Sequence, residues 1–277
     1  MTQPFSSLLP MAFIGGGNMA QALISGWSKQ GVPVAHIHVV EPLADTRQRL
    51  ERSMGIHCHE SADSLPHDIR LVVWAIKPQV FKDVACGLKD RLTHALHVSV
   101  AAGVRSDSMA RWLNSARVVR AMPNTPALIG LGQTGLFARD AVLPQEREQI
   151  QQLMQAIGQT VWVDNEALLD AVTALSGSGP AYVFFFIEAM VNAGVRMGLS
   201  AEQAHQLAVG TFVGASELAR SSTESLAVLR DKVTSKGGTT HAAISHMQSD
   251  DLAGLIDQAL QAAQQRAIEL GNGLDRR

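Results

Sequence analysis

The chain has 277 residues, of which 46% are hydrophobic and 17% charged, and its formal net charge is −2. This balance excludes an intrinsically disordered chain, and the length allows one large domain or two ordinary ones. The charge gives no electrostatic reason to expect nucleic acid or an anionic membrane surface as a partner.

The cysteines and the N-terminus indicate the compartment. Cys58 and Cys86 have no CxxC spacing, so we expect neither a metal site nor a redox pair. Residues 1–10 lack the basic region and small-residue cleavage site of a secretory signal. Both observations favour a cytoplasmic protein.

Short apolar runs alternate with amphipathic stretches over residues 1–165, which predicts βαβ units and a mostly parallel sheet. Continuously apolar runs such as 71–76 suit strands covered on both faces. The predicted strands are Met11–Ile14, His36–Glu41, Leu71–Ile76, His97–Val100, Val118–Ala121, Gly135–Ala138 and Thr160–Val163. The predicted helices among them are Met19–Gln30, Ala44–Arg52, Val80–Arg91 and Ser106–Asn114.

From Glu166 onward, strand-like runs give way to long helical stretches. We therefore predict two domains, a dinucleotide-binding domain over residues 1–165 and a helical domain over residues 166–277. Polar residues interrupt the apolar stretch 181–198, so we expect a buried helix and no membrane span. Because a monomer of this size would struggle to bury so apolar a helix, we expect it to pack against a second subunit.

A glycine-rich segment, residues 15–20 (GGGNMA), follows the first predicted strand and opens the first predicted helix. It matches the dinucleotide fingerprint GxGxxG/A in the context that the fingerprint requires. Gly15 allows the tight turn, Gly17 leaves space for the pyrophosphate, and Ala20 lets the helix pack closely on the sheet. The phosphates are expected at the helix N-terminus, where free N–H groups favour negative charge.

Glu41 ends the second predicted strand, near the offset at which a carboxylate meets the adenosine ribose. Its charge repels a 2′-phosphate, so the sequence favours NADH over NADPH. Two alternatives stay open: Arg47 in the following helix turns to grip such a phosphate, or Glu41 is only a solvated strand end.

Other cofactor contacts are expected where neighbouring strands end, because an open parallel sheet binds its ligand in that crevice. Ile76, Lys77 and Pro78 follow one strand, and Ala101 and Gly103 follow the next. Lys77 either reaches a phosphate or the substrate, or is a surface lysine beside a proline that ends the strand.

Three later segments indicate a site. Residues 120–126 (RAMPNTP) end a strand and place polar groups, including Asn124, at the edge where a nicotinamide is expected. Residues 176–182 (SGSGPAY) open the long helix with small residues and an early proline. Residues 232–241 (KVTSKGGTTH) resemble an anion nest that could take a carboxylate.

These motifs occur in this order in pyrroline-5-carboxylate reductases, and the chain resembles that family roughly over residues 11–270. The resemblance implies hydride transfer from NAD(P)H to the C=N bond of 1-pyrroline-5-carboxylate, which gives L-proline as the last biosynthetic step. It also implies an α/β fold: an N-terminal Rossmann-type doubly wound sheet followed by an all-α C-terminal dimerisation domain. The implied assembly is at least a homodimer, with larger rings of dimers among relatives.

By position, the resemblance assigns individual residues. The residues implied around the substrate carboxylate are Ser235, Gly238, Thr239 and Thr240, with the Thr240 hydroxyl near the imine nitrogen. The residues implied at the cofactor are Asn18, Met19, Lys77 and Ala101. The family usually has proline where this chain has Lys236, which loosens the loop and adds a positive charge beside the carboxylate.

A protonated imine accepts hydride readily, so the protein has mainly to position the ring and tolerate the iminium. No pair of His, Asp or Glu lies within the motifs, in keeping with a reaction that needs no strong acid. We assign Thr240 orientation first and proton delivery second, both compatible with capping the following helix. His241, which titrates near neutrality, is the alternative acid.

Two other functions share part of this pattern. A β-hydroxyacid dehydrogenase has a similar front fingerprint, but such enzymes place a lysine after an asparagine in the rear domain, and here Arg196 follows Asn192. A nucleotide-binding module without chemistry would keep Gly15 and Gly17, yet has little reason to keep a carboxylate nest.

Overall fold

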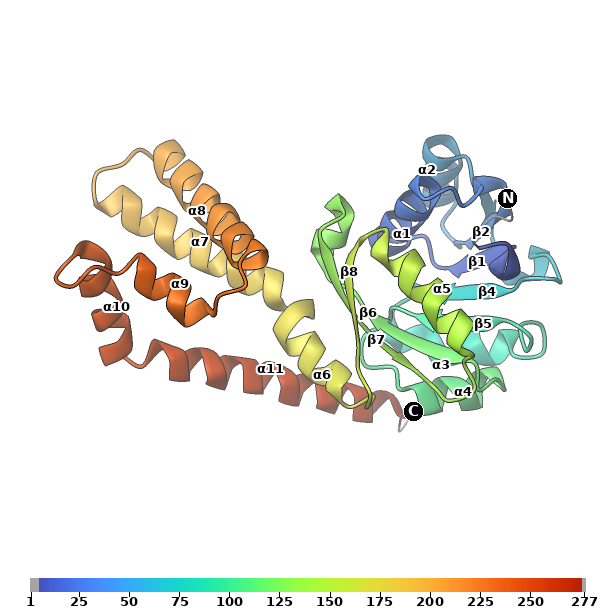
Figure 1. Cartoon of the computed structure of the whole chain (residues 1–277). Helices are drawn as coiled ribbons and strands as arrows, with labels where there is room; N and C mark the ends of the chain where they lie inside the picture. The colour runs from blue at the N-terminus through green and yellow to red at the C-terminus, as the bar shows by residue number, and fades with distance from the viewer. Residues whose placement is uncertain (1–4, 276–277) are drawn as a thin grey trace. The chain divides into compact units, whose positions relative to one another are not determined.

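The computed structural model describes residues 5–275 and forms two compact units (Figure 1). The first comprises Met1–Ser178 and Ala263–Arg277, and the second comprises Gly179–Ala262. The first unit therefore extends beyond the predicted boundary at residue 165 and includes the end of the chain.

An eight-stranded sheet forms the centre of the first unit, in the order β3-β2-β1-β4-β5-β6-β7-β8. All neighbours are parallel except β6 and β7. The strands are β1 (Met11–Ile14), β2 (Ile37–Val40), β3 (His57–His59), β4 (Leu71–Trp74), β5 (Leu96–Ser99), β6 (Val118–Met122), β7 (Gly132–Ala138) and β8 (Gly158–Trp162). The chain order reverses between β1 and β4, which is where such sheets bind ligands.

Alternate side chains of the central strands enter two separate hydrophobic clusters, one on each face of the sheet. Met11 and Phe13 of β1 join one cluster, whereas Ala12 and Ile14 join the other. Helices cover both faces (Figure 1), which confirms the predicted doubly wound α/β arrangement. The helices of this unit are α1 (Asn18–Lys29), α2 (Ala44–Met54), α3 (Pro78–Leu88), α4 (Ser106–Leu113), α5 (Pro144–Gln155) and α6 (Leu168–Val172), with a π-helical turn at Thr173–Gly177.

Two elements of this unit had not been predicted, and several predicted ends shift by one to three residues. The missed elements are β3, a three-residue edge strand, and α5, which is mostly polar. The helix predicted from Val80 begins at Pro78, because proline fits the first turn of a helix. The strand predicted over His36–Glu41 covers only Ile37–Val40.

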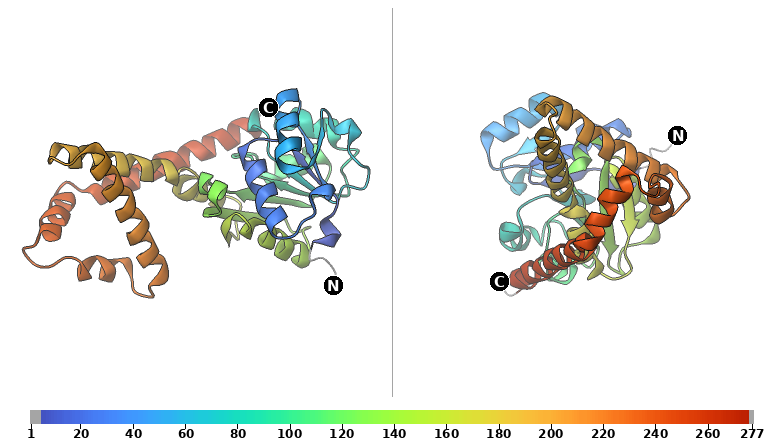
Figure 2. Two further views of the ribbon diagram at one scale, coloured as in Figure 1. Left: turned by 90° about the horizontal axis from the view of Figure 1, so that it is seen from above. Right: turned by 90° about the vertical axis from the view of Figure 1, so that its left-hand side faces the viewer.

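The second unit is entirely helical, as predicted, but it has almost no core of its own. Its helices are α7 (Gly179–Arg196), α8 (Ala201–Ser221), α9 (Leu226–Lys232), α10 (Thr239–Ser249) and the first part of α11 (Leu252–Asp275). Helices α7 and α8 lie side by side in Figures 1 and 2 and meet at small residues. Within this unit the buried residues are Gly194, Ala204 and Ala208.

In the single chain the helix predicted within 181–198 is largely exposed, with Phe184 and Phe185 at 66% and 67%. Its burial was predicted to come from a second subunit, which the single chain does not contain. The continuous helical stretch Leu168–Arg196 contains an 18-residue window with a mean hydropathy of 1.3, and by length and composition it could cross a membrane. An apolar helix that packs against another subunit has the same composition.

Candidate functional site

Gly15 lies in the turn between β1 and α1. Because it has no side chain, the backbone there can adopt a positive φ and approach the segment after β4 closely. Its φ is +97°, and a Cβ atom there would lie 2.6 Å from the carbonyl oxygen of Ala75, which follows β4. Only glycine meets both demands without strain. The turn therefore brings the ends of β1 and β4 together at the point where the strand order reverses.

Gly17 precedes α1 and faces open space. A Cβ atom at this position would meet no atom within 4 Å, and its φ of −68° is accessible to any residue. The N-terminal N–H groups of α1 start beside this space, with Asn18 and Met19 as the first helical residues. Ala20 is fully buried in the core against the sheet. This geometry fits the cradle that a pyrophosphate requires.

The carboxylate of Glu41 is tied to the glycine-rich turn. One oxygen accepts a hydrogen bond from the Gly16 N–H and the other from the Leu43 N–H, both at 3.1 Å. Arg47 lies on the same loop and donates to the carbonyl oxygens of Glu41 and Pro42 at 2.8 Å. The structure thus brings Glu41 to the fingerprint turn.

The residues after β4 lie beside the same turn. Ile76 contacts the Gly15 turn, since its Cγ2 lies 2.9 Å from the position of a Cβ there. Lys77 is exposed immediately before α3, and Pro78 is the first residue of that helix.

The two residues predicted after β5 have different surroundings. Ala101 is 7% exposed and its N–H donates to the Ser99 hydroxyl at 3.2 Å. Gly103 instead faces the end of α11, where a Cβ atom would lie 3.4 Å from Leu274 and 3.5 Å from the Gly271 nitrogen. Gly103 therefore has a packing role in this structure.

The amide of Asn124 connects three segments at the carboxyl end of β6. Its nitrogen donates to the Ser176 carbonyl at 3.1 Å, and its oxygen accepts from the Gln133 N–H at 2.9 Å. The side chain is buried, with 8% exposure. These bonds show Asn124 holding the turn after β6 against the π-helical turn, a role that the sequence had not indicated.

The predicted substrate residues lie together in the second unit: Ser235 and Gly238 in the loop before α10, and Thr239 and Thr240 at the start of that helix. Gly238 is the N-cap of α10, and its N–H donates to the Ser235 carbonyl at 3.0 Å. Within residues 5–275, the N–H groups of Thr239 and Thr240 make no hydrogen bond to the protein. Free N–H groups at a helix start favour an anion such as a carboxylate.

A buried ionic network joins β6, Glu166 and the start of α4, and it was not predicted from the sequence. Arg120 in β6 is 4% exposed and pairs with Glu166 at 2.7 Å. Glu166 also accepts hydrogen bonds from the Ser106 N–H and hydroxyl at the start of α4. Burial lowers the pKa of the Arg120 guanidinium, while the bond to Glu166 opposes that shift. The arginine within the otherwise apolar strand β6 could have indicated a buried ion pair.

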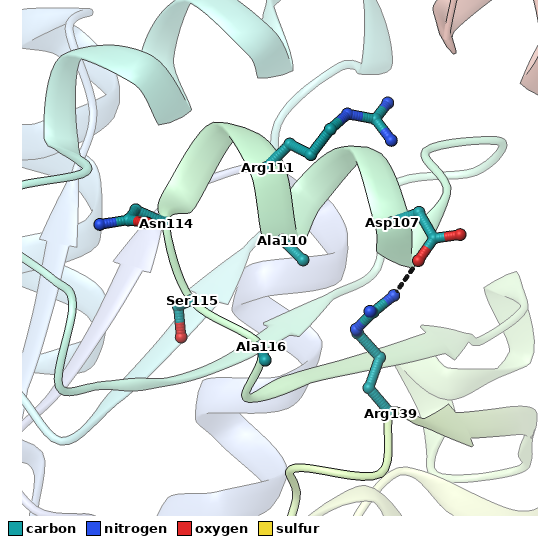
Figure 3. Close-up of a pocket in the computed structure, with 7 residues that line it drawn as sticks. All are labelled: Asp107, Ala110, Arg111, Asn114, Ser115, Ala116 and Arg139. Atoms are coloured by element: carbon teal, nitrogen blue, oxygen red, sulfur yellow. Dashed lines mark hydrogen bonds and ion pairs between the residues drawn. The ribbon is translucent and has the colours of Figure 1, made fainter.

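An open pocket of about 360 Å³ lies beside α4 (Figure 3), lined in part by Asp107, Arg111 and Arg139. Asp107 and Arg139 are paired across it. None of the predicted site residues lines this pocket. Among residues 5–275, no group of three or more His, Cys, Asp or Glu is arranged to hold a metal.

Comparisons with known proteins agree with the motifs. A family model described as pyrroline-5-carboxylate reductase dimerisation matches residues 166–270, and one described as NADP oxidoreductase coenzyme F420-dependent matches residues 10–103. The pyrroline-5-carboxylate reductase of Pseudomonas aeruginosa is 46% identical over 95% of this chain and 97% of that protein.

Solved structures give the same result. The reductase of Coxiella burnetii has a TM-score of 0.90 at 38% identity, covering 95% of this chain and 98% of that one. The Plasmodium falciparum enzyme, determined with NADP bound, has a TM-score of 0.84 at 25% identity, covering 96% and 99%. The chain belongs to the pyrroline-5-carboxylate reductase family.

Proposed function

We propose that this chain reduces 1-pyrroline-5-carboxylate to L-proline with NAD(P)H, as the last step of proline biosynthesis. Family membership makes the chain an oxidoreductase of this kind. The observation that carries the proposal from geometry is the Gly15–Gly17 turn, which opens onto unfilled space at the start of α1. That arrangement, at a helix start where the strand order reverses, fits a dinucleotide.

The cofactor site that we propose follows the carboxyl edge of the sheet. The turn at Gly15, Gly17, Asn18, Met19 and Ala20 holds the pyrophosphate, with Ile76, Lys77, Pro78 and Ala101 along the opposite wall. Asn124 and Gly103 hold the segments that follow β6 and β5 in place through their contacts within the protein. When bound, the reduced nicotinamide supplies a hydride to the substrate.

We propose NADH as the preferred cofactor, because Glu41 places a negative charge where a 2′-phosphate would lie. Arg47 stands on the same loop, but its guanidinium is held by two backbone carbonyls. A relative with NADP bound shows that the family accommodates that cofactor. In this proposal Glu41 and Arg47 determine the preference for NADH over NADPH, so substitutions at these two residues should change it.

The substrate carboxylate, in this proposal, binds the loop of Ser235, Gly238, Thr239 and Thr240, whose free N–H groups complement its charge. Lys236 in the same loop is exposed and adds a positive charge. The Thr240 hydroxyl orients the imine nitrogen. Because the imine is protonated before or during hydride transfer, a strong general acid is not required.

We also propose that the chain works in the cytoplasm as a homodimer at least. The second unit buries only three residues, so its exposed apolar helices need a partner to form a core. A second copy of the chain is that partner in this proposal, in keeping with the dimerisation family model over residues 166–270.

A steady-state assay tests the proposed function. The purified chain is mixed with 1-pyrroline-5-carboxylate and either NADH or NADPH, and cofactor oxidation and proline formation are followed together. We expect equal amounts of oxidised cofactor and proline, with higher kcat/KM for NADH. Turnover of a β-hydroxyacid in place of the imine would contradict the proposal, and cofactor oxidation that does not depend on the imine would indicate a different activity.

A further inference from the structure

The hydroxyl of Ser176 is buried and, within residues 5–275, has no hydrogen-bond partner. Leaving a buried hydroxyl unpartnered destabilises the fold. Most buried polar side-chain atoms in proteins are paired, so a native exception calls for an explanation. The residue lies in the π-helical turn Thr173–Gly177, where the Ser178 N–H donates to the Thr173 carbonyl at 2.8 Å. Single π-helical turns of this kind are frequent at functional sites.

Ser176 lies at the carboxyl edge of the sheet. Its carbonyl accepts the hydrogen bond from Asn124, two residues beyond the end of β6. The next residue, Gly177, is packed against Met122, the last residue of β6, since a Cβ there would lie 2.7 Å from the Met122 Cε. Ser176 therefore stands over the strand end where ligands of parallel sheets bind.

The strand order decides which end of a dinucleotide reaches this position. Glu41 follows β2, on one side of the switch point between β1 and β4, whereas Ser176 stands at β6 on the other side. A dinucleotide whose pyrophosphate lies at the start of α1 spans the switch point. With its adenosine over the β2 half, its nicotinamide extends toward β5 and β6.

We propose that the Ser176 hydroxyl hydrogen-bonds the carboxamide of the bound nicotinamide ring and so fixes the orientation of that ring. This inference rests on the proposed cofactor site. The residue as a whole is half-buried, and in this proposal its unpartnered hydroxyl turns about χ1 to meet the carboxamide. Because the hydroxyl gives up no internal hydrogen bond, the new bond contributes its full net value to binding.

The carboxamide is a better match than the substrate carboxylate. A hydroxyl offers one donor and two acceptor positions, and a carboxamide offers both kinds of group in return. Ser176 also belongs to the compact unit that contains the sheet and the fingerprint, whereas the loop with free N–H groups for a carboxylate belongs to the other unit.

The test compares whole cofactors with fragments that lack the nicotinamide. Dissociation constants of NADH, NADPH, ADP-ribose and 2′-phospho-ADP-ribose are measured by fluorescence titration for the wild type and Ser176→Ala. We expect the variant to bind both reduced dinucleotides about 3- to 10-fold more weakly and both fragments unchanged. Its Tm should stay the same or rise, because the substitution removes an unpartnered buried hydroxyl.

Two further variants sharpen the result. Ser178→Ala, at a half-buried serine of the same segment, should bind all four ligands like the wild type. Ser176→Cys keeps nearly the same size with a weak donor and should lose most of the same affinity, which guards against a folding defect in the alanine variant.

Two outcomes overturn the inference. Equal weakening of NADH and ADP-ribose would show a general effect on the fold, and unchanged NADH binding with a raised KM for 1-pyrroline-5-carboxylate would assign the hydroxyl to the substrate. The proposed reaction is tested independently of Ser176. If the wild type binds NADH but does not reduce the imine, the proposed reaction is contradicted, whereas the inference about Ser176 is not.

Discussion

Glu41 accepts a hydrogen bond from the backbone N–H of Gly16 at 3.1 Å, which joins the end of β2 to the glycine-rich turn. The acidic side chain is thus held at this turn by the protein itself. This contact makes the charge at residue 41 a fixed feature of the proposed adenosine site.

Glu41→Gln should therefore shift the cofactor preference toward NADPH by about fivefold or more, since removing one repulsive charge near a phosphate is worth at least about 1 kcal/mol. Glutamine retains an oxygen that can accept from Gly16. The measurement is the ratio of kcat/KM for NADPH to that for NADH. Glu148→Gln, at an exposed site on α5, serves as the control. An unchanged ratio in Glu41→Gln would remove the assignment.

The two fingerprint glycines should respond differently to alanine. Gly15→Ala forces a left-handed residue against the Ala75 carbonyl and should cost about 2–5 kcal/mol of unfolding free energy. Gly17→Ala meets no protein atom and should leave stability within about 0.5 kcal/mol of the wild type, yet weaken NADH binding at least about tenfold. Urea unfolding and NADH titration separate these effects. Full NADH affinity in Gly17→Ala would show that the space is not the pyrophosphate cradle.

Most of the Rossmann-type unit was predictable because its strands and helices have clear periodicity. Strand β3 was not, because its three residues, His57 to His59, have no apolar run. Helix α5 was missed for its many polar residues, although Ile150, Leu153 and Met154 have helical spacing and are buried. In both cases, tertiary contacts determine the secondary structure, which the short local sequence pattern does not indicate.

The candidate site was predictable to a similar extent. The motifs located the turn at Gly15 and the loop at Ser235, because each has a local conformation that only certain residues allow. The partners of Asn124 were not predictable, since Ser176 is 52 residues away. The π-helical turn also depends on packing that no local pattern encodes.

Thr240→Val should lower kcat/KM for 1-pyrroline-5-carboxylate about tenfold or more, because it removes the hydroxyl proposed to orient the imine nitrogen. Thr240→Ser keeps that hydroxyl and should stay close to the wild type. Thr234→Val is the matched control, since the Thr234 hydroxyl donates to the Arg230 carbonyl within its own helix end. Equal rates for Thr240→Val and the wild type would contradict this role of the hydroxyl, which also does not cap α10, because Gly238 is the N-cap and no side-chain cap hydrogen bond is present.

Stability should fall in acid because His97 is fully buried and neutral. Burial lowers the pKa of His97 to about 4, and its Nδ1 accepts a hydrogen bond from the Trp74 indole at 3.2 Å. The unfolded chain takes up this proton from about pH 6.5 downward, whereas the folded chain does so only near pH 4. The free energy of unfolding should therefore decrease across this window by on the order of 3 kcal/mol from this group.

His97→Gln retains an acceptor for Trp74 but has no proton to take up. Urea unfolding at pH 7 and pH 5 should show a smaller loss of stability in this variant than in the wild type. The variant should still lose some stability between pH 7 and pH 5, because burial and the neighbouring His59 and His57 also lower the pKa of His38 to about 4. Identical losses in wild type and variant would contradict the role of His97.

The second unit should fold only with a partner. Phe185→Glu places a charge on an exposed apolar helix of that unit and should reduce the dimer fraction in sedimentation velocity, together with activity. Leu143→Glu, at a residue 59% exposed in the first unit, should have little effect on either. A wild type that sediments as a folded, active monomer would contradict the proposed homodimer.

The most direct test uses NADH labelled with deuterium at the transferred position of the nicotinamide. After turnover with 1-pyrroline-5-carboxylate, mass spectrometry and NMR of the product locate the label. The account predicts L-proline with one deuterium on the ring carbon that was double-bonded to nitrogen. Proline without the label, or oxidised cofactor without proline, would contradict direct hydride transfer to the imine.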